Sequence, residues 1–196
     1  MGRPRLHDAD LKARLIARAR DIVDRGGEEA LVLRSLAAAE RTSTSAIYTL
    51  FGSRELLITA VVADAMAAYR EAMSLAVEGE SDPRRRVQRF AIAYLEFARN
   101  NAGLYRVLFV RQSPSELASV GETARSMFEG QLRALGEAIE RDAHDPVTFR
   151  RAVAMWIELH GIATLRPAHP NFPWPSETDL IAAVVDRALE PVQTPR

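Results

Sequence analysis

Residues 41–54 read RTSTSAIYTLFGSR, and within this stretch four consecutive hydroxyl side chains, at positions 42–45, precede an apolar pattern. Apolar residues at helical spacing predict a short helix over residues 44–50, with a buried face formed by Ala46, Ile47 and Leu50. Another short helix is predicted just before it, over residues 33–39. Two short helices joined by a tight turn, the second rich in small polar residues, are typical of a helix-turn-helix.

The other face of the second helix suits the major groove of DNA. Short hydroxyl side chains let a helix approach base edges closely, and they donate or accept hydrogen bonds. The residues of this kind are Ser43, Thr44, Ser45 and Thr49. Ser43 also suits the N-cap of the helix, while Tyr48 and Arg54 suit phosphate oxygens. Taken singly, each residue is better explained by a loop or by core packing, so the prediction depends on the cluster as a whole.

Helical periodicity extends over almost the whole chain and predicts about nine helices and no strand. Gly26 and Gly27 mark the end of the first helix, whose N-cap is expected at Asp8 or Asp10. Four prolines exclude a helix from residues 166–175. The predicted fold is all-α, with a three-helix N-terminal module joined to an α-helical body.

Composition and charge limit the functions that are open to the chain. It contains no cysteine, so disulfides and thiolate metal sites are excluded, and no metal or cofactor is expected. No apolar run is long enough to cross a membrane, and we expect a cytoplasmic protein without a membrane partner. Residues 1–20 carry six basic side chains against two acidic ones, although the formal net charge of the chain is zero.

This uneven charge favours one small surface that faces nucleic acid. A solvated helix face with a disordered tail explains the charge alone at least as well. The zero net charge disfavours a protein that coats DNA without regard to sequence.

A longer pattern surrounds the hydroxyl cluster and reads Leu36-Ala37…Ser43-x-x-Ala46-Ile47-Tyr48-x-x-Phe51-x-Ser53-Arg54-Glu55-x-Leu57. This pattern resembles the DNA-binding domain of TetR-family transcriptional regulators, and the resemblance covers roughly residues 9–69. It implies a helix-turn-helix that binds double-stranded DNA at a palindromic operator. The position in the turn where that family usually has glycine holds Arg41, which would need a left-handed or otherwise adjusted backbone. Arg41 could offset that strain by reaching a phosphate.

The same resemblance implies a role for each of several residues. Those that face the major groove are Ser43, Thr44, Ser45 and Thr49. Those that hold phosphates are Arg34, Ser35, Tyr48 and Arg54. Residues 1–8 are similar to a basic arm that some family members place in the minor groove, which implies contacts from Arg3 and Arg5. A disordered tail is an equal alternative for that segment.

Trp156 and His160 lie four residues apart on one predicted helix face and are followed by Gly161. A histidine of the core or of an interface is the simpler explanation. The block nevertheless resembles a ligand-binding and dimerisation domain of TetR-family proteins that carries a Trp-x-x-x-His-Gly signature, over about residues 83–190. That resemblance implies a homodimer in which the helices at 146–165 and 177–190 pair with those of a second copy.

An apolar pocket in this body is expected to bind a small apolar or aromatic effector. Its candidate lining residues are Tyr94, Leu108, Phe109, Met127, Phe128, Trp156 and His160. Most helical cores need such residues in any case.

The function predicted from the sequence is that of a DNA-binding transcriptional regulator, a homodimeric repressor that the effector releases from its operator. The alternative is a helical enzyme or small-molecule carrier without a role at DNA. Because the chain has no glycine-rich phosphate loop, nucleophile elbow or metal cluster, we do not expect an enzyme.

Overall fold

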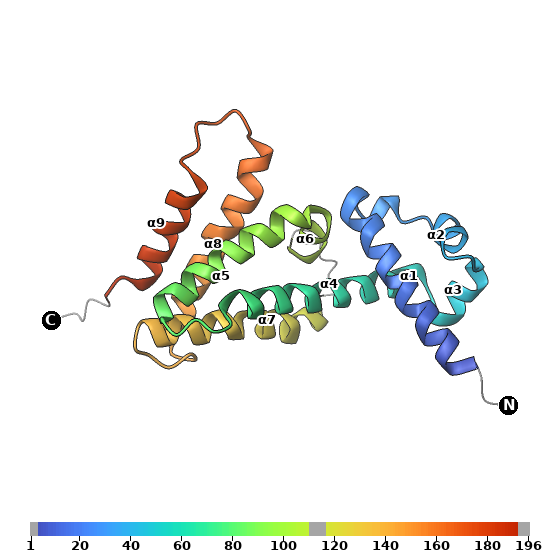
Figure 1. Cartoon of the computed structure of the whole chain (residues 1–196), viewed down its shortest axis with the longest axis horizontal. Coiled ribbons are helices and arrows are strands. Elements are labelled where there is room, and N and C mark those ends of the chain that lie inside the picture. The colour runs from blue at the N-terminus through green and yellow to red at the C-terminus, as the bar shows by residue number, and fades with distance from the viewer. Residues whose placement is uncertain (1–3, 110–116, 192–196) are drawn as a thin grey trace. The chain divides into compact units, whose positions relative to one another are not determined.

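The computed structural model describes the backbone of residues 4–109 and 117–191, and the side chains of those residues except 4–7 and 117–127. This part of the chain forms nine α-helices and one 3₁₀ turn and contains no strand (Figure 1). The predicted all-α class is therefore confirmed. None of the described helices alone is long and apolar enough to cross a membrane. One pair, Thr44–Phe51 with Arg54–Val77, passes that test jointly but is bent by 66°.

The helices belong to two compact units. The first consists of Met1–Tyr69 and Asn101–Ser113, and the second of Arg70–Asn100 and Pro114–Arg196. The elements of the first unit are α1 (Pro4–Gly26), η1 (Glu28–Ala30), α2 (Leu33–Ala39), α3 (Thr44–Phe51), most of α4 (Arg54–Val77) and α6 (Ala102–Phe109). The second unit contains the end of α4 with α5 (Pro83–Asn100), α7 (Leu117–Ala138), α8 (Pro146–Ala168) and α9 (Glu177–Leu189).

The first unit is built around the apolar face of α1. Leu15, Ala19 and Val23 recur at intervals of four along α1, and all three are buried. α2 packs against both α1 and α3, while α6 packs against α1. The buried aliphatic residues from the other helices of this core include Leu36, Ile47, Leu57, Val61, Leu104 and Leu108.

α6 is fixed to α1 by a polar cap as well as by packing. The Oδ1 atom of Asp24 accepts hydrogen bonds from the backbone N–H groups of Gly103 and Leu104, at 3.1 and 3.2 Å. These N–H groups lie in the first turn of α6, where no intrahelical acceptor exists. A Cβ atom at Gly103 would overlap the backbone carbonyl groups of Val23 and Asp24, so only glycine lets the two helices approach this closely.

The second unit places α5 at the centre of its packing, in contact with α7, α8 and α9. The face of α5 that is buried there carries Val87, Phe90, Ala91, Tyr94, Leu95, Phe97 and Ala98. α8 and α9 run antiparallel beside each other (Figure 1). Two ion pairs connect α8 and α9: Arg187 contacts Glu158 at 3.3 Å, and Glu177 contacts Arg166 at 3.4 Å. Glu177 also contacts Arg99 of α5 at 3.1 Å.

Two local expectations were wrong, and one short element was not predicted. α1 begins at Pro4 and not at Asp8 or Asp10, because proline already has the backbone φ of a first helical turn. α8 continues through Pro167, within the stretch from which prolines were expected to exclude a helix. A proline so close to the end removes only one hydrogen bond, and His169 N–H still donates to the Leu165 carbonyl at 2.9 Å. The turn η1 was not predicted.

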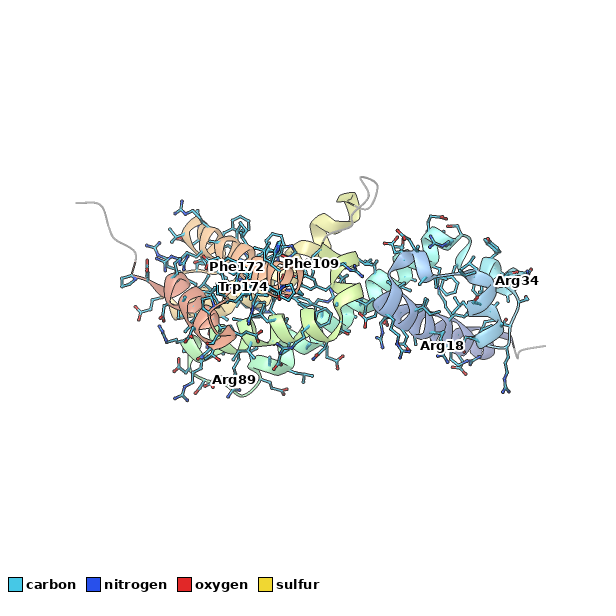
Figure 2. The ribbon with its side chains drawn as sticks, turned by 90° about the horizontal axis from the view of Figure 1, so that it is seen from above. Arg18, Arg34, Arg89, Phe109, Phe172 and Trp174 are labelled. Atoms are coloured by element: carbon cyan, nitrogen blue, oxygen red, sulfur yellow. The ribbon has the colours of Figure 1, made fainter. Side chains whose placement is uncertain are left out.

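The connection between α8 and α9 is ordered by two aromatic side chains. The Nε1 atom of Trp174 donates to the carbonyl oxygen of His169 at 3.0 Å. The rings of Phe172 and Trp174 lie 4.6 Å apart between their centroids, and Figure 2 shows them together. Ser176 then caps α9 by accepting from Asp179 N–H at 3.1 Å, as the sequence predicts.

Candidate nucleic-acid interface

α3 is held in place at both ends by capping groups. The Oγ atom of Ser43 accepts a hydrogen bond from Ala46 N–H at 3.1 Å, which confirms the predicted N-cap. At the other end, Gly52 has a φ of 84° and ends the helix. Ser53 then caps α4 by accepting from Leu56 N–H at 3.1 Å. The length and direction of α3 are thus set by its own flanking residues.

The turn between α2 and α3 is a Schellman motif with arginine in the left-handed position. Thr42 N–H donates to the carbonyl oxygen of Ala37 at 2.9 Å, and Arg41 N–H donates to that of Ala38 at 3.2 Å. Arg41 has a φ of 52°, as the left-handed turn expected from the sequence requires. For a residue with a Cβ this conformation costs about 1 kcal/mol.

The same turn is attached to α1 by one carboxylate. Glu40, the last residue before Arg41, accepts from the Nε atoms of Arg14 and Arg18 at 3.3 and 3.2 Å. The Glu40 side chain is only 11% exposed, whereas both arginine side chains are about half exposed. The sequence interpretation missed this contact, although the spacing of the two arginines by four residues puts them on one face of α1.

α3 separates an apolar face from a polar one. Ile47 and Phe51 are buried, as predicted for Ile47. On the outer side Ser43, Ser45, Tyr48 and Thr49 are exposed, and Thr44 is half-buried. Tyr48 is 52% exposed, so this large ring lies on the outer side of α3 and not in the core. The residues expected to face the groove therefore form one surface.

Basic and polar side chains flank this surface. Arg34, Ser35 and Arg41 are exposed, and Figure 2 shows Arg34 on α2 and Arg18 on α1. The Nζ atom of Lys12 lies 5.5 Å from the centre of the Phe51 ring, which brings one further cation close to α3. The expected contacts of Arg3 and Arg5 lie outside the described side chains.

Arg54 has a role that the sequence interpretation did not anticipate. Its guanidinium group donates to the carbonyl oxygens of Leu31 at 3.3 Å and Glu28 at 2.5 Å. These oxygens belong to η1 and the residue after it, so Arg54 ties the start of α4 to the turn after α1. The side chain is half-buried and turned inward, and we therefore leave Arg54 out of the proposed DNA contacts.

Three of the residues expected to line an effector pocket form one aromatic group. Phe128, Trp156 and His160 lie together in the second unit, with ring centroids 5.6 Å apart for Phe128 and Trp156 and 5.8 Å for Trp156 and His160. Tyr94 is almost completely buried in the core of that unit. Burial lowers the pKa of His160 below its usual value.

Leu108 and Phe109 belong to the first unit, where the Phe109 ring contacts Tyr105 at 4.7 Å and Tyr69 at 5.9 Å. Met127 lies outside the described side chains. A shallow pocket of about 240 Å³ is present in the first unit between the end of α1 and α6, and its lining includes Glu28, Glu29 and Arg106. Its charged lining differs from the apolar site expected from the sequence.

Comparison with known proteins identifies the fold and the family. A solved protein of unknown function from Rhodococcus sp. RHA1 is 27% identical, with a TM-score of 0.77, over 91% of this chain and 93% of its own. The TetR family transcriptional regulator PfmR from Thermus thermophilus is 22% identical, with a TM-score of 0.63, over 92% of this chain and 100% of its own.

A TetR-like transcriptional regulator from Rhodococcus sp. RHA1 is 18% identical, with a TM-score of 0.65, over 91% of this chain and 93% of its own. At such identities the likeness establishes the fold alone. No curated protein sequence matches the chain. The family model described as "Tetracyclin repressor-like, C-terminal domain" matches residues 87–190, which is more than half of the chain. The chain therefore belongs to the TetR family of transcriptional regulators.

Proposed function

We propose that the chain binds double-stranded DNA with the outer face of α3 in the major groove. The observation that carries this proposal is the two-sided construction of α3, which is anchored by buried Ile47 and Phe51. Its opposite side exposes Ser45, Tyr48 and Thr49. Short side chains at the centre of that side allow the helix to approach base edges, as a recognition helix must.

The residues around α3 supply contacts to the DNA backbone. Arg34, Ser35 and Arg41 are exposed beside α3, and the Tyr48 hydroxyl group extends from its flank. Guanidinium and hydroxyl donors bind phosphate oxygens without reading sequence, so they set the register of the helix on the duplex. The N-terminal end of α3 adds the positive end of a helix dipole. Arg3, and Arg5 in the first turn of α1, complete the proposed set with contacts to the minor groove.

A homodimer is part of the proposal, because a palindromic operator needs two recognition helices. α8 carries an apolar ridge on its outer side, with Phe149, Val153, Ile157, Gly161 and Leu165 at intervals of four. Phe149, Ile157 and Leu165 are 48–59% exposed. A Cβ atom at Gly161 would meet nothing within 4 Å among the described residues, so another helix could approach there closely. Such i, i+4 ridges pack well into the grooves of a second helix.

Release from the operator by a small ligand completes the proposed repressor mechanism. The support for it is the aromatic group of Phe128, Trp156 and His160 in the second unit. Burial lowers the pKa of His160, which favours the neutral imidazole in this group. Such surroundings suit an apolar or aromatic ligand. The ligand would act by favouring a conformation that binds the operator less well.

Binding to DNA from upstream of the protein's own gene tests the core of this proposal. Fluorescence anisotropy with that DNA and with an unrelated duplex of equal length measures both affinity and specificity. Tyr48→Ala is expected to weaken operator binding about tenfold, because a hydrogen bond to a charged phosphate is lost. Tyr48 is exposed, so the variant should remain folded.

Leu75→Ala is the matched control, because Leu75 is 60% exposed and belongs to the second unit. It should leave the affinity for the operator unchanged. Equal affinity of the wild-type protein for the upstream and the unrelated duplex would contradict sequence-specific binding.

A further inference from the structure

Two residues, Ser45 and Thr49, lie at the centre of the outward side of α3. Successive residues of an α-helix are about 100° apart around its axis. The buried residues Ile47 and Phe51 define the inner direction, and Ser45 and Thr49 fall on the opposite side of the helix. Both are exposed. In a helix that enters the major groove with this side forward, they come nearest to the base edges.

The hydroxyl group of Thr49 is already engaged within α3. Its Oγ1 atom donates a hydrogen bond to the backbone carbonyl oxygen of Ser45 at 3.0 Å. A hydroxyl group has one proton, and this bond uses it. What Thr49 offers to a partner outside the helix is therefore its methyl group together with a remaining lone pair.

α3 also lacks the long side chains that usually identify purines. Its sequence, TSAIYTLF, contains no arginine, lysine, asparagine or glutamine. The bidentate contacts that those residues make with guanine or adenine are thus not available from α3. Apolar contact with the 5-methyl group of thymine is a major-groove contact that a threonine methyl group can make.

We propose that the Thr49 methyl group contacts the 5-methyl group of one thymine in each half-site. Thr49 thereby makes the protein prefer thymine at that position. This inference rests on the proposed DNA binding by α3. It assigns a chemical feature, a pyrimidine 5-methyl group, to the base that lies opposite the centre of the helix.

The test replaces each thymine of the bound upstream DNA in turn with deoxyuridine, which lacks only the methyl group. With the wild-type protein, one such replacement per half-site is expected to reduce affinity about fourfold, from the loss of one buried methyl contact. Thr49→Ser removes the methyl group and keeps the hydroxyl group. It should bind thymine DNA about sixteenfold more weakly, because both half-sites lose the contact, and it should lose all discrimination against deoxyuridine at that position.

Thr49→Val is the matched control, because it keeps a methyl group and removes the hydroxyl group. It should retain both operator affinity and discrimination against deoxyuridine. The inference is overturned if Thr49→Ser still discriminates at every position that the wild-type protein distinguishes, or if the wild-type protein distinguishes none. An unrelated duplex is measured alongside. If it binds as tightly as the upstream DNA, the proposed DNA recognition fails, and this inference fails with it.

Discussion

At position 41 an arginine occupies a backbone conformation that glycine adopts with less strain. The two hydrogen bonds of the Schellman motif hold the residue there, and its side chain extends into solvent beside α3. Glycine would fit this turn without the strain of a Cβ. The guanidinium group is therefore what distinguishes Arg41 from glycine at this turn, in line with the proposed contact to a phosphate.

Replacing Arg41 with glycine separates the two effects. Relief of the left-handed strain and the greater freedom of glycine in the unfolded chain oppose each other, so the free energy of unfolding should change by less than about 1 kcal/mol. Operator affinity should fall several-fold with the loss of a phosphate contact. Urea unfolding and fluorescence anisotropy measure the two quantities.

Arg85→Gln is the control for net charge, because Arg85 is an exposed arginine of the second unit. It should bind the operator like the wild-type protein. If Arg41→Gly also bound like the wild-type protein, Arg41 would have no part in DNA binding.

At the scale of helices, the contact between α1 and α6 depends on one carboxylate and one glycine. Asp24 supplies the acceptor for the first turn of α6, and Gly103 provides the space for close packing. α6 has only eight residues, too few to be stable as an isolated helix. Its attachment to α1 is thus the main local source of its order.

Asp24→Ala should destabilise the protein by about 1 kcal/mol, because two N–H groups of α6 lose their acceptor. Asp24→Asn retains a side-chain oxygen at the same place and should keep most of the stability. The midpoint of urea unfolding compares the two variants. Equal losses in both would mean that the negative charge of Asp24, and not its capping oxygen, stabilises this contact.

Helix positions were predictable wherever the signals are local. Ser43 and Ser176 each cap a helix that starts at the following residue, and glycine or proline marks several of the boundaries. Long-range partners were not predictable in this way. Arg54 contacts residues 23 and 26 positions earlier in the chain, and Asp24 contacts residues 79 and 80 positions later. Nothing in the sequence around Arg54 distinguishes an arginine that binds a carbonyl group from one that binds a phosphate.

At the scale of the whole molecule, the feature still without a partner within the described chain is the outer ridge of α8. Large aliphatic and aromatic side chains are exposed on it in succession, and such surfaces usually mark an interface. The sequence suggested pairing of the last two helices through a family resemblance. The structure shows which residues of α8 stay exposed and are thus available for that pairing.

Ile157→Glu places a charge at the centre of this ridge and should convert the proposed dimer into a monomer at micromolar concentration. Light scattering coupled to gel filtration measures the mass. Leu75→Glu introduces the same change at an equally exposed aliphatic residue of the second unit, 60% against 59%, and should leave the mass unchanged. A monomeric wild-type protein, or a dimeric Ile157→Glu variant, would contradict the proposed interface.

The carboxylates that face α1 have a consequence for the ionic strength dependence of DNA binding. Glu40 pairs with Arg14 and Arg18, and Asp64 pairs with Arg20 at 2.9 Å. These three arginines are half of the basic residues in the first twenty positions, yet each is already ion-paired within the protein, with Arg14 and Arg18 sharing one carboxylate. Each phosphate that a protein neutralises releases condensed counterions and adds about −0.9 to the slope of log affinity against log salt. The slope of log affinity against log salt should therefore reflect the proposed phosphate contacts beside α3. It should be less steep than the slope expected if every basic residue in the first twenty positions also bound a phosphate.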